Sequence, residues 1–486
     1  MSAIALLAII VAWYVLKRIV SYRGNLPPGP VSIPLLGSWE FIQLCWTGGR
    51  LEDLCRRLGA KYGPIVFFRI ALDTPVVVIR TYDALKEAAK DVRLHGMTGT
   101  YLNRLAGHWD NLGVSLADGS KWQHNRKFII RTLGRLGFNR NKLETLASAE
   151  CSKLVEDLVE LKGQVVNIER ELTGAIANVT LKFIMNFEFE SHDPRIGELK
   201  DASFHIVRLL ANIQSHLDFF PWLAHFSSQR SDVKTLARSL DKVSHFIKAR
   251  IDEHIETLDE AHPRDFIDEY LLQIPKADHD TSIENLLVML KDLLLGSLEP
   301  PPIALSWTIL LLAKHPEVQE RVRAELTELL GDHRAPTVED ERQCPYTQAA
   351  IEETLRFVTL TPINRHSTTQ GATSLRGYHI PAGAMVLADQ HSLHHDPAVW
   401  GDPDVFRPDR FLSENGAKLR EQVRAFGFGP RVCLAEAHAR SLLFAFLAGL
   451  LRRIEFHLPE KGQVATMPVH QVLSRPSETL VVPFPR

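Results

Sequence analysis

Residues 426–433 read FGFGPRVC, and an apolar stretch with helical spacing follows from Leu434. Two glycines and a proline in so short a stretch predict a tight loop whose backbone can approach a ligand closely. The loop ends in Cys433, which we expect at the entrance of the following helix, where unpaired N–H groups and the helix dipole favour a thiolate. Arg431 adds a positive charge nearby. Taken by itself, such a cysteine before a helix is most often a small buried hydrophobic residue.

The composition is that of a large globular protein. The chain has 486 residues, of which 45% are hydrophobic and 23% charged, with a formal net charge of −2. These values exclude a disordered tail, a collagen-like rod and a disulfide-stapled miniprotein. The length suggests about three domains of ~150 residues, or one large enzyme domain. So neutral a charge balance gives no reason to expect nucleic-acid binding.

The cysteines are scattered and odd in number, at positions 45, 55, 151, 344 and 433. No two of them form a C-x-x-C pair, which argues against zinc-ribbon and thioredoxin-like sites. Scattered cysteines in a chain of this length are typical of reduced thiols, of which at least one can be functional.

The N-terminal residues differ from the rest of the chain. Residues 3–16 are apolar and uncharged, Lys17 and Arg18 follow, and Trp13 stands where an interfacial aromatic residue would. A cleaved signal peptide would instead place positive charge before the apolar stretch and a small-residue cleavage site after it. We therefore predict three parts: an uncleaved transmembrane anchor at 1–22, a stiff Pro-rich linker at 23–30, and a globular domain at 31–486 that faces the cytosol.

Helical periodicity dominates the globular part. Apolar residues recur at helical spacing over residues 141–161, 234–257, 283–298, 304–330 and 435–451. Short strand-like stretches cover residues 65–70, 75–79, 384–388 and 480–482. We expect a predominantly α-helical domain with small β-sheets, one of them near its start, and see no interior linker that would divide it.

The pattern Phe-x-x-Gly-x-Arg-x-Cys, formed by Phe426, Gly429, Arg431 and Cys433, resembles the haem-binding loop of the cytochrome P450 family. The resemblance implies the cytochrome P450 fold, haem b as the cofactor, and the Cys433 thiolate as the axial ligand of the iron, which favours O–O cleavage. The family often has glycine two residues after the cysteine, where this chain has Ala435.

Three further motifs follow in the family's order. Glu353 and Arg356 resemble the Glu-x-x-Arg of its K helix, where positions three apart share one face. Residues 406–411 (FRPDRF) resemble the segment whose arginine completes a buried Glu–Arg–Arg network. Trp122 and Arg126 resemble the helix that offers a tryptophan and an arginine to a haem propionate. Together with the cysteine loop, these matches cover essentially the whole globular part.

The resemblance also implies propionate contacts from Arg431 and from His366, with Arg365 as the competing choice for the latter. Finer matches, among them RDFID at 264–268 and RGYHIP at 376–381, resemble animal microsomal enzymes that process steroids and foreign compounds. That branch implies a single-pass protein of the endoplasmic reticulum membrane with its catalytic domain in the cytosol. The implied partners are NADPH-cytochrome P450 reductase, cytochrome b5 as a further candidate, and a lipophilic small-molecule substrate.

The distal helix departs from the family pattern. Where the family reads Ala/Gly-Gly-x-Asp/Glu-Thr-Thr, residues 296–302 read GSLEPPP. The acid is retained as Glu299, and the threonine that organises proton delivery is replaced by Pro301. Three successive prolines remove three N–H donors, and an interior proline costs a helix about 3 kcal/mol. We therefore predict a break near residues 298–301, with the prolines in the first turn of a restarted helix.

Three functions remain open. The first is a haem-thiolate monooxygenase that inserts one oxygen atom from O2 into a lipophilic substrate with electrons from NADPH, while Glu299, Ser297 and a water held by the freed carbonyls supply protons. The second is a redox-neutral isomerase or dehydratase acting on a peroxide or an oxygenated substrate, since such family members can lack the threonine. The third is a haem sensor or carrier without turnover, against which the retained Glu299 and the intact Cys433 loop argue.

Basic residues gather in two stretches, 126–135 and 420–424, which the family fold places on the haem-proximal side. Such a face would suit an acidic reductase, and a scattered, solvated basic surface is the alternative. Substrate-lining segments are expected to be mostly apolar, which predicts a lipophilic substrate. These segments are residues 98–113, 204–223, 295–299, 360–363 and the turn around Ser474.

Overall fold

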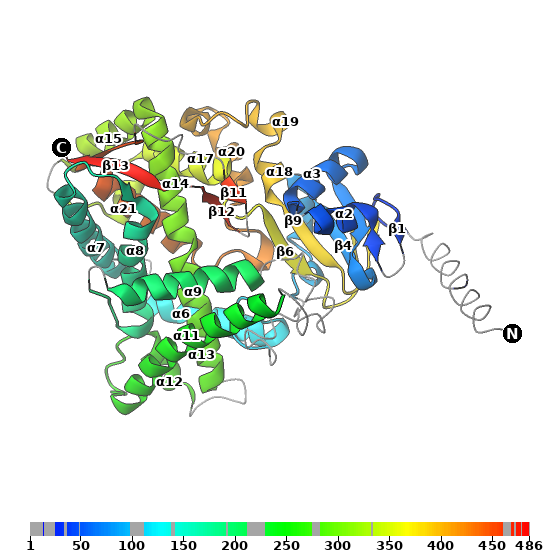
Figure 1. The fold of residues 1–486 in the computed structure, drawn as a ribbon, viewed down its shortest axis with the longest axis horizontal. Coiled ribbons are helices and arrows are strands. Elements are labelled where there is room, and N and C mark those ends of the chain that lie inside the picture. The colour runs from blue at the N-terminus through cyan, green and yellow to red at the C-terminus, as the bar shows by residue number, and fades with distance from the viewer. Residues whose placement is uncertain are drawn as a thin grey trace. The chain divides into compact units, whose positions relative to one another are not determined.

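The computed structural model of the chain is mostly helical and contains small β-sheets, in agreement with the fold class expected from the sequence (Figure 1). The structure describes residues 13, 25–33, 36–47, 49–97, 111–137, 141–190, 193–210, 229–274, 282–331, 334–459, 468–470, 473–477 and 479–485. The predicted anchor at 1–22 therefore lies outside the described residues, apart from Trp13. The described part of the linker, residues 25–30, has no regular secondary structure.

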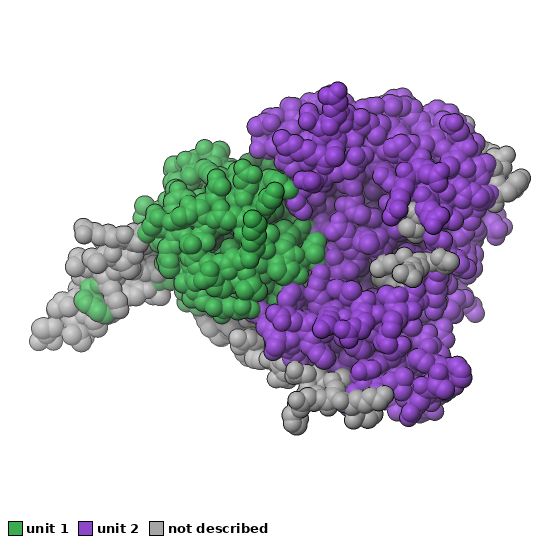
Figure 2. All heavy atoms as spheres, turned by 180° about the vertical axis from the view of Figure 1, so that it is seen from behind, with its two compact units in different colours: residues 1–98, 362–393, 427–432 green, residues 99–361, 394–426, 433–486 purple. Residues whose placement is uncertain are grey.

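The chain forms two compact units, which Figure 2 shows in green and purple. Unit 1 comprises residues 1–98, 362–393 and 427–432. Unit 2 comprises residues 99–361, 394–426 and 433–486. Each unit draws on three separate stretches of the chain, so the single catalytic domain expected over 31–486 stays a prediction.

Unit 1 is built on a four-stranded sheet with the strand order β3-β4-β9-β6. β3 (Ile65–Arg69) pairs antiparallel with β4 (Pro75–Ile79), and β4 pairs parallel with β9 (Met385–Asp389). The outer strand β6 (Ile363–Ser367) pairs antiparallel with β9. The central strands β4 and β9 are almost entirely buried, as expected for unbroken runs of branched apolar residues. Three predicted strands are confirmed, but local sequence does not reveal that the sheet joins two distant parts of the chain.

The other elements of unit 1 are short. They are β1 (Ser32–Ile33), β2 (Gly37–Ser38), α2 (Trp39–Thr47), α3 (Leu51–Tyr62), η1 (Ala71–Asp73), α4 (Tyr82–Ala88), η2 (Val92–Leu94), β7 (Thr373–Leu375), β8 (Tyr378–Ile380), η7 (Gly429–Arg431) and α18 (Gln390–His394), whose last residue belongs to unit 2. α3 buries Leu51, Leu54, Cys55 and Leu58, which the helical spacing places on one face.

Unit 2 contains the long helices. They are α6 (Gly119–Arg135), α7 (Asn141–Glu160), α8 (Ile168–Met185), α9 (Pro194–Leu210), α11 (Gln229–Glu256), α12 (Phe266–Leu271), α13 (Ile283–Leu298), α14 (Pro300–Lys314), α15 (Pro316–Leu330), α16 (Val338–Glu341), α17 (Pro345–Val358), α19 (Pro397–Trp400), η6 (Pro408–Leu412), α20 (Gly416–Gln422) and α21 (Glu436–Leu451). The strands β10 (Ile454–His457), β13 (Leu480–Pro485) and β5 (Val166–Asn167) form one small sheet, and β11 (Pro468–His470) pairs with β12 (Ser474–Pro476).

Most of the predicted helices are confirmed, and one is wrong. α7, α13 and α21 match their predicted ranges closely, and α11 begins earlier than predicted. The single helix predicted over 304–330 is divided at His315, whose φ of −121° and ψ of 74° are not helical. Pro316 is the reason, because it lacks an N–H and disfavours helical geometry in the residue before it.

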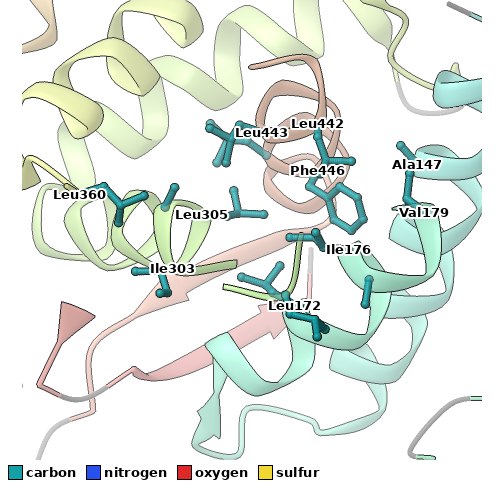
Figure 3. Close-up of a cluster of buried hydrophobic side chains, with 14 of the residues drawn as sticks. Ala147, Leu172, Ile176, Val179, Ile303, Leu305, Leu360, Leu442, Leu443 and Phe446 are labelled. Carbon is teal, nitrogen blue, oxygen red and sulfur yellow. The ribbon is translucent and has the colours of Figure 1, made fainter. Parts of the chain in front are cut away.

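α14 lies at the centre of unit 2. Its residues 302–313 are all buried, as expected for a helix that is apolar on every side. Figure 3 shows side chains from α8, α14 and α21 meeting in one cluster, including Ile176, Leu305 and Phe446. Among the described residues, the stretch Ile283–Lys314 is long and apolar enough to cross a bilayer, but 72% of its most apolar window is buried inside the protein. It therefore serves as the core helix pair of unit 2.

A buried ionic network fixes α17. Glu353 and Arg356 are fully buried one helical turn apart and share two hydrogen bonds of 2.8 Å. Arg410 of η6 donates to the same carboxylate at 3.1 Å, whereas Arg407 reaches it through its backbone N–H at 2.9 Å. Other donors of the two buried guanidinium groups bond to backbone carbonyls of residues 394–405. The Glu–Arg–Arg network expected from the motifs is confirmed, with Arg410 as its second arginine.

Glu353→Gln should lower the free energy of unfolding by about 3–5 kcal/mol, because it removes the anion of the fully buried Arg356 and leaves Arg410 with its pair to Asp402 alone. Arg407→Ala is the matched control, since it keeps the backbone N–H and removes only an exposed pair with Asp402, for which we expect less than about 1 kcal/mol. Urea unfolding of both variants measures the difference. Similar losses in the two would contradict the central role of the Glu353 carboxylate.

Candidate functional site

Cys433 closes a tight loop in front of α21. Its backbone N–H donates to the carbonyl of Phe426 at 2.9 Å, which folds residues 426–433 back on themselves. Gly427 and Gly429 have φ angles of +89° and +63°, a region that residues with side chains rarely adopt. α21 begins at Glu436, later than the predicted helical start, so Cys433 lies just before its first turn.

The Cys433 side chain is surrounded by protein atoms, yet it is the exposed one among the chain's five cysteines. Burial raises the pKa of its thiol, and the Ala435 N–H and the Arg126 charge oppose that rise. The N–H group at the helix entrance lowers the pKa of the thiol, as expected from the sequence, but desolvation outweighs its effect. A bound metal would deprotonate the thiol outright. A desolvated thiol that still faces open space suits an axial ligand.

α6 places Trp122 and Arg126 on one face of the helix. The helix is capped by Asp118, whose side chain accepts from the Gly119 N–H at 2.8 Å. Trp122 is buried, and the Arg126 guanidinium lies 5.9 Å from the centre of its ring. Burial lowers the pKa of Arg126, and the Cys433 thiol acts against this shift. Unit 2 thus brings three of the predicted site residues together.

The Phe426 ring packs against an arginine of α21. The Arg440 guanidinium lies 4.9 Å from its centre. Arg440 also pairs with Glu436 at 3.1 Å and with Glu352 of α17. The aromatic residue that opens the cysteine loop is therefore fixed by charges from two helices, and its predicted place beside the cysteine is supported by the Cys433–Phe426 hydrogen bond.

In unit 1, His366 of β6 is buried, and neither of its ring nitrogens has a hydrogen-bond partner among the described residues. Its ring packs edge-on against His95 and Phe428, with centroid distances of 5.2 and 4.8 Å. Burial lowers its pKa to about 3, and the neighbouring His95, Arg431 and Arg365 act in the same direction. Such a cluster of basic side chains is suited to an anionic group.

Arg431 is held beside this cluster by a hydrogen bond from its Nε to the His95 carbonyl at 3.0 Å. No sequence motif pointed to His95, whose Nε2 lies 3.0 Å from the Ala88 carbonyl and whose role depends on tertiary contacts. Adjacent strand residues point to opposite faces of a sheet, so Arg365 and His366 cannot share one. His366 is the one whose ring packs on Phe428 of the cysteine loop, which favours it over Arg365.

These observations fit haem. Unit 2 offers a soft thiol ligand at Cys433, with the cation Arg126 acting on it. Taken by itself, unit 1 offers Arg431 and the ring nitrogens of His366, which lack hydrogen-bond partners among the described residues, and these are the kinds of donor that carboxylates such as haem propionates require.

The distal helix is interrupted where the sequence predicts. α13 ends at Leu298, Glu299 has a φ of −110° and a ψ of −65°, and Pro300 starts α14. The prolines lie in the first turn of the restarted helix, where their missing N–H groups cost least. Pro300 and Pro301 occupy the two positions of the family's threonine pair, so neither position carries a hydroxyl group.

The two predicted proton-carrying side chains are both buried at this interruption. Ser297 donates its hydroxyl proton to the Leu294 carbonyl at 2.8 Å. Glu299 forms an ion pair with Arg475 of β12, a residue that no sequence pattern singled out. Of the predicted substrate-lining segments, residues 98–110 and 211–223 lie outside the described residues.

A second cluster of potential metal ligands is already satisfied. The ligand atoms of His254, Asp265 and Asp268 lie within 4.8 Å of one another. The His254 Nε2 atom is 2.6 Å from Asp265, and its Nδ1 atom is 2.6 Å from the Arg250 carbonyl. Arg264 donates to Asp268 at 2.6 Å. We interpret this part of the RDFID motif as structural.

The comparisons with known proteins agree with the geometry. A family model described as Cytochrome P450 matches residues 27–484. Cytochrome P450 2B4 of Oryctolagus cuniculus is 32% identical over 446 residues, which cover 90% of this chain and 89% of that protein. Cytochrome P450 2C25 of Mesocricetus auratus is 31% identical over 480 residues, covering 94% and 93% of the two chains. Cytochrome P450 2J2 of Homo sapiens is 30% identical over 451 residues, covering 91% and 88%.

Cys433→Ala should abolish the thiolate-type absorption band of the reduced carbon-monoxide complex, because it removes the soft ligand of the iron. Cys45→Ala is the matched control, since Cys45 is a half-buried thiol of α2, and it should keep the band. Reduced carbon-monoxide difference spectra of the purified proteins provide the measurement. A Cys433→Ala protein that retained the thiolate-type band would refute the ligand assignment.

Proposed function

The chain belongs to the cytochrome P450 family of haem-thiolate monooxygenases, and from this premise we propose that it inserts one oxygen atom from O2 into a lipophilic substrate with electrons from NADPH. The observation that carries the proposal is the Cys433 loop, which presents a desolvated but accessible thiol. When bound, haem supplies the oxygen chemistry, and thiolate ligation favours O–O cleavage.

In this proposal, each haem-binding role is assigned to an individual residue. Cys433 would ligate the iron, and Phe426 would help to hold the loop that carries it, since its carbonyl accepts the Cys433 N–H. Basic or N–H-bearing side chains hold the propionates by charge-assisted hydrogen bonds. The proposed haem-binding residues are Trp122, Arg126, His366, Phe426, Arg431 and Cys433.

In this proposal Glu299 accepts and passes on protons on the distal side, and Ser297 assists it. A carboxylate can accept a proton and pass it on, which a proline cannot. Because prolines 300–302 have no N–H, the carbonyls of residues 296–298 lack their ordinary helical donors and can hold water. The Glu299 side chain belongs to the same interruption, which supports its assignment as the proton-carrying residue.

The exposed end of α6 supports a docking role. An open hollow of about 440 Å3 lies along the helix and is lined by Trp122, Gln123, Arg126, Lys127, Ile130 and Arg131. Beyond the two residues assigned to haem, the exposed cations Lys127 and Arg131 flank the exposed Ile130, which suits an acidic partner of moderate affinity. We propose that NADPH-cytochrome P450 reductase binds here, with cytochrome b5 as a further partner. The same proposal places the chain in the endoplasmic reticulum membrane through residues 1–22, with the catalytic part in the cytosol.

The prolines favour a second candidate function. Two threonine positions of the distal helix carry no hydroxyl, and family members that rearrange peroxides or dehydrate oxygenated substrates can dispense with it. The second candidate is therefore a redox-neutral isomerase or dehydratase. It differs from monooxygenation in needing neither reductase nor O2.

Product formation from a panel of lipids and foreign compounds should require NADPH, reductase and O2 together, because monooxygenation consumes all of them. Chromatography of reactions that each lack one component measures this requirement. Turnover of a hydroperoxide or an oxygenated lipid at full rate without NADPH would instead establish the redox-neutral function.

Lys127→Glu should raise the KM for reductase by roughly tenfold at low ionic strength, because it reverses a charge on the docking face. Lys248→Glu makes the same charge change on an exposed position of α11 and should leave the KM unchanged. Reductase titrations at low and high salt give both values. An equal effect of the two variants would contradict docking on α6.

A further inference from the structure

Glu299 is a buried carboxylate in need of a counter-charge. Its exposed fraction is 1%, and its Oε1 atom accepts no hydrogen bond from the described residues. An isolated buried carboxylate would be strongly unfavourable, so such groups are paired or become protonated. Within the described part of the chain, the charge that contacts it is the Arg475 guanidinium.

Arg475 lies on β12, and hydrogen bonds of the neighbouring Ser474 fix the position of this strand. The neighbouring Ser474 donates its N–H to the Leu360 carbonyl at 2.7 Å and its hydroxyl to the Thr359 carbonyl at 3.0 Å. Trp307 of α14 donates its indole N–H to the Ser474 carbonyl at 2.8 Å. The backbone of Arg475 is therefore anchored to α14 about two helical turns from the interruption that carries Glu299.

A second carboxylate shares the guanidinium, and it has a cation of its own. Arg475 donates to Glu169 of α8 at 2.9 Å, and its guanidinium lies 5.0 Å from the centre of the Phe204 ring. Lys200 of α9 lies 3.2 Å from the same Glu169 oxygen and donates to the Thr173 hydroxyl at 2.9 Å. Two cations thus face two carboxylates. Because Lys200 balances Glu169, the charge of Arg475 remains available for Glu299.

We propose that Arg475 is a positioning residue that keeps the Glu299 carboxylate ionised at the interruption between α13 and α14 and directs it toward β12. An ionised carboxylate that keeps one oxygen open, as Glu299 keeps Oε1, can take a proton from water, whereas a protonated one cannot. By keeping the Glu299 carboxylate ionised, Arg475 maintains a proton acceptor where the threonine of the family is missing. This consequence for turnover rests on the proposed monooxygenase function, but the charge state of Glu299 does not.

The charged groups that face Glu299 come from three elements. They are Arg475 of β12, which contacts it, and Glu169 of α8 and Lys200 of α9, which reach it through Arg475. Burial lowers the pKa of Lys200, and Glu169 opposes this shift. Arg475 remains charged at any pH used for enzymes, because a guanidinium does not lose its proton in proteins.

Infrared difference spectroscopy of the full-length, haem-loaded protein reads the charge of Glu299 directly. At neutral pH, the difference between wild type and Glu299→Gln should show carboxylate stretches and no carboxylic-acid C=O stretch. Arg475→Met should gain that C=O band, and the Arg475→Met/Glu299→Gln double variant should lose it. Arg475→Lys keeps the charge and should not gain the band.

Glu169→Gln is the matched control, because it removes the other carboxylate of Arg475 and leaves Glu299 in place. It should show no acid band. An acid band of Glu299 in the wild-type protein would overturn the proposal, as would a band in Arg475→Met that survives Glu299→Gln. The comparison of wild type with Glu299→Gln determines whether Glu299 is ionised even if Arg475→Met does not fold.

The pH profile of turnover separates positioning from simple stabilisation. With a panel compound that the wild type converts, Arg475→Met should shift the acid limb of NADPH-dependent product formation to higher pH by about one unit or more. A loss by the same factor at every pH would overturn the positioning role. Absence of NADPH-dependent product from the wild type would refute the monooxygenase proposal, and the infrared result would still decide on Arg475.

Discussion

The three prolines at residues 300–302 constrain the centre of unit 2. They open α14, whose residues 302–313 are all buried, and they end the hydrogen-bonding pattern of α13 at Leu298. Because the interruption lies between two core helices, its side chains are buried and must be satisfied by other parts of the fold. The distal chemistry of the site follows from this constraint, since two prolines occupy the positions of the family's threonine pair.

Buried charges in unit 2 are stabilised by fixed counter-charges in two different ways. Glu353 is enclosed by hydrogen bonds from Arg356 and Arg410, so its carboxylate serves structure. Glu299 contacts Arg475 through Oε2, and its Oε1 atom accepts no hydrogen bond from the described residues, so that oxygen can still bind water. We infer that the same principle, a buried carboxylate paired with arginine, stabilises the fold at one place and serves proton transfer at the other.

The parts of the structure that follow local rules could be predicted from the sequence. The loop before Cys433 follows from its glycines, the pair Glu353 and Arg356 from helical spacing, and the interruption at Glu299 from proline geometry. Contacts between distant segments could not be predicted. His95 has no motif of its own, and Arg475 meets Glu299 only because β12 is bonded to α14. The thiol pKa of Cys433 also depends on burial, which sequence spacing does not reveal.

Isotope labelling tests the central claim, that the chain activates O2 although prolines replace the distal threonines. A panel compound that the enzyme converts is incubated with NADPH, reductase and isotopically labelled dioxygen, and the product is analysed by mass spectrometry. Monooxygenation predicts one labelled oxygen atom in each product molecule. Product that contains no label, or only oxygen from water or from the substrate itself, would contradict the account.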